Sequence, residues 1–95
     1  MKTNFEISLK FKLCKGIEEY GCFQVGANEL FAKELFNMME GTEDITKESI
    51  MLIDFIKWER GIPFPVNAKH CTYNQLATNV KLITRELFKQ HQLAH

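Results

Sequence analysis

The feature that most constrains the fold is a strict alternation of apolar and polar side chains near the N-terminus. From Phe5 to Leu13 every odd position is apolar, and every even position is Glu, Ser or Lys. Because successive side chains of a strand point to opposite faces of a sheet, the pattern predicts a strand with one buried and one polar face.

The segment that follows is predicted to return beside this strand. Lys15-Gly16 interrupts the alternation, and residues 20–25 are rich in aromatic and β-branched side chains. We therefore expect a β-hairpin whose second arm places Phe23 and Val25 on the core side.

A first helix is predicted over residues 28–40. The Asn28 side chain can accept hydrogen bonds from the unpaired amides of a first helical turn, and Gly41 offers a left-handed stop. Apolar residues recur at helical spacing between them. Those expected on the buried side are Phe31, Leu35 and Met38, with Leu30 and Met39 beside them.

The second helix has the strongest start signal in the chain. Thr72 and Gln75 form a capping box, in which each side chain binds the other residue's amide, and Cys71 and Leu76 stand at the two positions of a hydrophobic staple. Apolar residues then follow at steps of four and three, which predicts a helix to about Gln90. They are Leu76, Val80, Ile83 and Leu87.

Two further strands are predicted between the helices. Residues 50–58 form a short apolar, β-branched run, and a turn at 59–61 follows it. Beyond the turn, Ile62, Phe64 and Val66 alternate with two prolines, which cannot donate to a ladder. The sequence leaves open whether 62–66 is an edge strand or an extended polyproline segment.

The order of elements is therefore ββαββα, which predicts one small α+β domain over residues 1–95. We expect an antiparallel or mixed sheet of three to four strands with both helices on one face. Residues 14–17 resemble 59–62, and a helix cap follows each glycine by 12 and 11 residues. Duplication of a ββα unit is one interpretation of this internal sequence similarity.

Composition narrows the class of function. Twelve Lys and Arg balance twelve Asp and Glu, so no overall field attracts nucleic acid or an anionic membrane. No apolar run reaches the length of a membrane span, and the N-terminus lacks the apolar core of a secretory signal. Three cysteines without CxxC spacing suit reduced thiols. These features predict a cytoplasmic protein that does not bind membranes.

No established catalytic or cofactor motif is present, so we expect a noncatalytic protein without a cofactor. His70-Cys71 combines an imidazole and a thiol, but neighbours on an extended chain point to opposite sides. The possible zinc ligands lack the close pairs that structural sites use, so no metal site is expected. They are Cys14, Cys22, His70, Cys71, His91 and His95.

The third strand indicates where an interaction surface could lie. Burying an unpaired Asp54 would cost several kcal/mol, so we place Met51, Ile53 and Phe55 in the core. The opposite parity then presents an apolar cluster bordered by Lys10, Lys12 and Asp54, which is typical of a protein interface. Its members are Ile50, Leu52, Ile56 and Trp58. The reverse parity, or cover by the tail after residue 90, would remove this surface.

Nucleic-acid binding is the alternative function. Lys81, Arg85 and Lys89 recur at four-residue steps along the last helix, where a basic stripe could contact phosphates, although Glu86 interrupts it. A second platform could combine Lys10 and Lys12 with Trp58 and Tyr20 for base stacking on the sheet, but no RNP1-type consensus is present.

Four segments together resemble a small uncharacterised family of Bacteroidetes proteins. They are the first strand ISLKFKL, the junction GCFQVGAN, the IDF segment and the C-terminal HCTYNQLATNVKLITRELFK, which together extend over nearly the whole chain. The resemblance implies a bacterial cytosolic origin and supplies no activity or site residues. From the residues themselves we expect a noncatalytic interaction or regulatory module that self-associates through its sheet, with another protein as a further partner.

Overall fold

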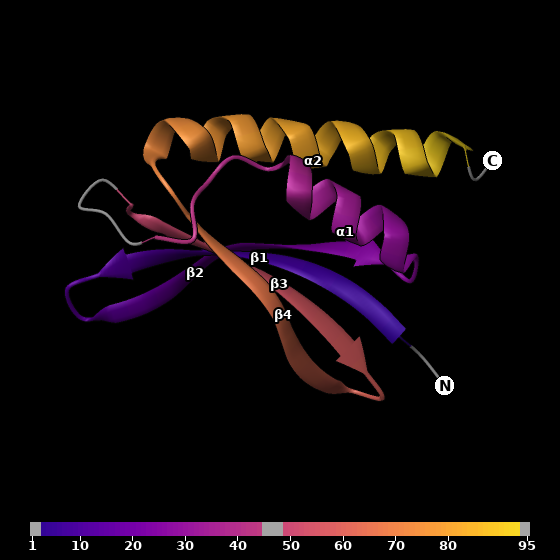
Figure 1. The fold of residues 1–95 in the computed structure, drawn as a ribbon, viewed down its shortest axis with the longest axis horizontal. Coiled ribbons are helices and arrows are strands. Elements are labelled where there is room, and N and C mark those ends of the chain that lie inside the picture. Colours follow the sequence, from indigo (N-terminus) through magenta and orange to yellow (C-terminus); the bar gives the residue numbers. More distant parts are fainter. Residues whose placement is uncertain (1–2, 45–48, 94–95) are drawn as a thin grey trace.

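A computed structural model describes residues 3–44 and 49–93. Four antiparallel strands form one sheet in the order β2-β1-β3-β4, and both helices lie on the same side of it (Figure 1). The elements are β1 (Thr3–Leu13), β2 (Gly16–Gly26), α1 (Glu29–Met38), β3 (Met51–Glu59), β4 (Ile62–Cys71) and α2 (Tyr73–Leu93). This confirms the predicted α+β class and the ββαββα order.

The segment 62–66, which the sequence left open between an edge strand and a polyproline segment, is part of the edge strand β4. Pro63 pairs with Trp58 and Pro65 with Ile56, and the strand continues to Cys71. Two residues with positive φ join β3 to β4, Arg60 at 54° and Gly61 at 81°. This geometry is typical of the tight two-residue turn that matches the twist of a hairpin.

The core lies between the sheet and the helices. On β3, Met51, Ile53 and Phe55 are each at most 2% exposed, which confirms the predicted parity of this strand. Phe5, Ile7 and Leu9 of β1 are equally buried, Val25 is 5% exposed, and Phe23 packs against the same cluster. The alternation of β1 therefore places Phe5, Ile7 and Leu9 correctly in the core, whereas Leu13 at its end is 49% exposed.

The predicted buried side of α1 is wrong for two residues. Leu35 is buried, but Met38 is 51% exposed and Leu30 is 67% exposed. The helix instead buries Ala32, Leu35 and Phe36, which share one stripe at the i, i+3, i+4 spacing, and Met39 directly after the helix is buried as well. Phe36 decides this rotation because its ring stacks on that of Phe55, with centroids 5.1 Å apart.

Gly41 does not provide the predicted left-handed stop. The helix ends at Met38, and the capping residue Met39 is extended, with its N–H donating to the Phe36 carbonyl. Gly41 is needed for close packing instead. A Cβ at this position would lie 3.0 Å from the His70 carbonyl oxygen and 3.1 Å from the Lys69 Cβ. The adjacent Thr42 forms a two-way backbone bridge with His70.

Two long-range polar contacts hold the end of α1. Lys69 of β4 donates from Nζ to the carbonyls of Phe36 at 2.8 Å and Met39 at 2.9 Å, so it supplies the cation that the last turn of α1 lacks. Asn79 of α2 is fully buried, accepts from the Glu40 amide at 2.7 Å and donates to the Glu40 carbonyl at 2.8 Å. The segment after α1 is thereby tied to β4 and to α2.

The start of α2 confirms the capping box. The Thr72 amide donates to Gln75 Oε1 at 2.9 Å, and the Gln75 amide donates to Thr72 Oγ1 at 3.3 Å. Cys71 and Leu76 of the predicted staple are both buried. The helix extends three residues beyond the predicted end, to Leu93. No helix in the described part of the chain is long and apolar enough to cross a membrane.

Candidate interaction face of the sheet

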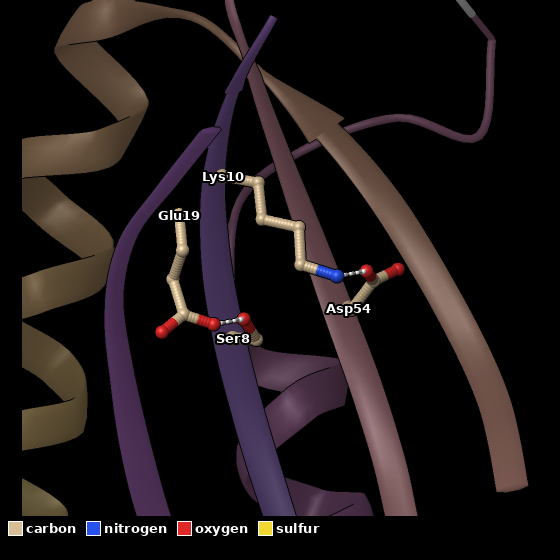
Figure 2. A network of polar contacts seen from close by, with 4 residues as sticks. All are labelled: Ser8, Lys10, Glu19 and Asp54. Carbon is tan, nitrogen blue, oxygen red and sulfur yellow. Dashed lines mark hydrogen bonds and ion pairs between the residues drawn. The ribbon is translucent and has the colours of Figure 1, made fainter. Parts of the chain in front are cut away.

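One face of the sheet carries no helix among the described residues; we call it the open face. Strand pairing brings even-numbered residues of β1 and β3 together on it, and Figure 2 looks onto this face with α1 behind the strands. The neighbouring pairs across β1 and β3 are Asn4 and Trp58, Glu6 and Ile56, Ser8 and Asp54, and Lys10 and Leu52.

The open face has an apolar half over β3 and β4. Leu52, Ile56 and Trp58 are each partly buried. On β4, Pro65 pairs with Ile56 and Pro63 with Trp58, whereas Ala68 pairs with Asp54. Ile50 precedes β3 and is 39% exposed, and its carbonyl oxygen accepts a hydrogen bond from the Lys12 amide. The structure thus places three of the four predicted interface residues on this face and Ile50 at its end.

The other half of the open face, over β1 and β2, is a network of polar contacts. Ser8 is 1% exposed and donates from Oγ to Glu19 Oε1 at 3.1 Å (Figure 2). Lys10 Nζ is 2.7 Å from Asp54 Oδ2, and this hydrogen bond raises the pKa of Lys10. The lysines predicted to border the apolar cluster are therefore engaged in cross-strand contacts.

Glu6 is the buried acid of the open face, at 9% exposure. Its Oε1 accepts from the Trp58 indole at 3.0 Å and from the Gln24 amide at 3.1 Å. Desolvation, followed by a hydrogen bond to Glu6, raises the pKa of the Cys22 thiol to about 11. A thiol with so high a pKa is a poor nucleophile at neutral pH.

His70 and Cys71 lie on opposite sides of the sheet, as adjacent strand residues must. Cys71 is fully buried, and burial raises the pKa of its thiol. His70 contacts Lys12 Nζ through Nδ1 on the open face, and its pKa is lowered by desolvation and then by Lys12. The two side chains therefore do not form a nucleophile–base pair.

The thiols of the chain are free. Cys14 and Cys22 are exposed, Cys71 is buried, and among the described side chains no three His, Cys, Asp or Glu gather closely enough to hold a metal ion. The side chains of His91 and His95 lie outside the described part of the chain.

The basic stripe of α2 is exposed but partly neutralised. Glu86 Oε2 lies 3.1 Å from Arg85 Nε and 3.6 Å from Lys89 Nζ, while Lys81 is simply exposed. Two of the three predicted phosphate contacts therefore share one carboxylate, which weakens the positive field of this helix.

The predicted base-stacking platform is divided between two sides of the sheet. The Tyr20 ring meets Phe11 edge-on, with centroids 5.2 Å apart, and it lines a hollow with Tyr73 and Leu76 of α2. Trp58, Lys10 and Lys12 belong to the open face. The strand register explains the difference, because a shift between Leu9 and Lys10 makes Tyr20 an extra residue in β2.

Comparison with protein-family models, with curated proteins and with solved structures finds no match. The resemblance to a Bacteroidetes family stays a prediction, and the open face must be interpreted from its own chemistry.

Proposed function

We propose that the protein is a noncatalytic interaction module that self-associates through the open face. The observation that carries the proposal is the apolar half of this face, with Leu52, Ile56 and Trp58 beside a polar network of both charge signs. Partly covered apolar side chains gain stability when a second surface removes them from water. The cysteine usage favours a cytoplasmic setting for this module, and the resemblance to a Bacteroidetes family implies a bacterial one.

The area of the face suggests how strong the association would be. β3 is nine residues long. Four strands about 4.8 Å apart, at about 3.3 Å per residue, give a face of roughly 600 Å². A standard stable interface covers about 800 Å² per partner. This area lies at the small end for a stable interface, so we expect a weak dimer that exchanges with the monomer.

The charges of the face favour a second copy over an anionic polymer. Carboxylates of Glu6, Glu19 and Asp54 lie among the ammonium groups of Lys10 and Lys12. In a two-fold dimer each copy can offer its cations to the partner's anions. A nucleic acid would bring its phosphates against three carboxylates.

Sedimentation velocity over a range of concentrations tests the proposal. The mass should rise with concentration, and Trp58→Glu should keep the protein monomeric because it places a charge in the contact. Leu52→Lys repeats the test without removing the indole bonded to Glu6. Phe88→Glu is the matched control, since Phe88 is 63% exposed on α2, and it should associate normally.

A concentration-independent monomer mass would refute the proposal, as would equal loss of association in Phe88→Glu. Salt-dependent retention on nucleic acid, abolished when the stripe residues Lys81, Arg85 and Lys89 are changed to Gln together, would favour the alternative function instead.

A further inference from the structure

A hollow of about 320 Å³ lies at one corner of the open face, where β1, β2 and the β3–β4 turn meet. It is open to solvent on one side, and its lining residues are Asn4, Glu6, Gln24, Trp58 and Gly61. The side chains in this set supply one carboxylate, two amides and one indole ring.

The lining is rich in acceptors. Gln24 and Trp58 both donate to the same oxygen of Glu6, Oε1. Because Gln24 uses its amide nitrogen in that contact, its carbonyl oxygen is the acceptor that this side chain retains, and the Asn4 side chain has another amide oxygen. Acceptor oxygens beside an aromatic ring are the surroundings that a guanidinium or ammonium group prefers.

The charge of Glu6 is only partly compensated within the fold. Both donors that its Oε1 accepts from are neutral groups. Lys10 interacts with Glu6 electrostatically, but its ammonium is hydrogen bonded to Asp54 at 2.7 Å. A carboxylate at 9% exposure is largely desolvated, and a cation that reached it would form a charge-assisted hydrogen bond.

We infer that the hollow between Glu6 and Trp58 binds an organic cation, a guanidinium or alkylammonium group. The cation would sit against the Glu6 carboxylate, with the indole of Trp58 as one wall and the amide oxygens of Gln24 and Asn4 completing its contacts. The inference does not rest on self-association, because all of these residues belong to one copy of the chain.

The single tryptophan of the chain makes the site its own reporter. Trp58 fluorescence is followed while ethylguanidinium chloride is added at constant ionic strength, with the protein diluted to where sedimentation shows a monomer. Ethylurea is the neutral ligand of similar shape. We expect a saturable change with ethylguanidinium and none with ethylurea. In NMR spectra of the ¹⁵N-labelled wild-type protein, the amide chemical-shift changes caused by ethylguanidinium should concentrate at residues 4, 24, 58 and 61.

Two variants, each of which replaces one carboxylate by an amide, distinguish binding at the hollow from attraction to the overall charge of the open face. Glu6→Gln keeps an acceptor for Trp58 but removes the charge, so affinity should fall by about tenfold or more. Glu19→Gln keeps an acceptor for Ser8, removes a carboxylate of the open face that lies outside the hollow, and should leave affinity within about twofold. Circular dichroism checks that both variants fold.

An equal response to ethylguanidinium and ethylurea would overturn the inference, as would equal affinity in wild type and Glu6→Gln or shifts scattered over other residues. The source of the cation is distinguished by a short arginine-containing peptide. Binding much tighter than that of ethylguanidinium supports a basic side chain of a partner protein, whereas equal affinity supports a free small cation.

Discussion

Asn79→Ala should destabilise the fold strongly, because this one side-chain amide makes two hydrogen bonds to backbone groups. In the native protein this side chain makes both hydrogen bonds to the Glu40 backbone, at 2.7 Å and 2.8 Å, from a position with no solvent exposure. Each bond contributes about 1 kcal/mol net, and a buried partner left unpaired adds about 1 kcal/mol or more. Because Glu40 is itself exposed and water can reach part of its backbone, we expect a loss of about 2–3 kcal/mol in the free energy of unfolding.

Urea unfolding measures this loss, with Trp58 fluorescence and circular dichroism as two probes. The midpoint should fall while the slope with denaturant stays the same, because the unfolded surface is unchanged. For a domain of this length the loss corresponds to roughly 10–20 °C in melting temperature.

Asn74→Ala is the matched control, since Asn74 lies exposed on the same helix and should change stability by less than about 0.5 kcal/mol. If Asn79→Ala lowered the free energy of unfolding no more than this control does, the hydrogen bonds to Glu40 would not stabilise the fold and the reasoning would be refuted.

Two further predictions use the loop after α1 and the polar half of the open face. Gly41→Ala should lower the free energy of unfolding by about 1–3 kcal/mol through crowding against β4, whereas Gly21→Ala, with open space around it, should not; equal melting temperatures would contradict this. Alkylation of Cys22 by iodoacetamide, followed by peptide mass spectrometry, should rise with a midpoint near pH 11, and a midpoint near 9 would contradict the raised pKa. Because the unfolded thiol loses its proton first, the same shift should lower stability as the pH rises from about 9 to about 11.

Local signals predicted the elements well because local chemistry determines them. The alternation of β1 and the Thr72–Gln75 box both depend on residues close in sequence. The box is confirmed, and the alternation places Phe5, Ile7 and Leu9 correctly in the core, though not Leu13. The buried side of α1 was harder to predict, since apolar residues surround that helix and only the stacking of Phe36 on Phe55 selects a rotation.

Contacts between distant residues account for what the sequence did not reveal. Lys69 and Asn79 reach backbone groups more than 29 residues away, and no local pattern predicts such partners. A signal did exist for Asn79, which stands between Leu76 and Ile83 on the apolar stripe of α2; a polar residue there needs a buried partner.

The open face was predicted in part. Asp54 indicated the parity of β3 correctly, and this placed Leu52, Ile56 and Trp58 on the same side. Tyr20 was misplaced because the extra residue in β2 shifts the register, and the composition of the strand does not show where such a bulge falls. The sequence did not single out the buried Glu6, because there it is one polar residue among several in an alternating strand.

The two edges of the sheet differ in a way that limits assembly. Thr42 already occupies the outer side of β4 at His70, and Pro63 and Pro65 remove two amide hydrogens farther along the same edge. β2 carries no proline. Strand-by-strand addition of copies is therefore less favourable at β4 than at β2. If two β2 strands pair, both outer edges of the joined sheet are β4 strands that carry the prolines and the Thr42 bridge, which disfavours further growth by this route.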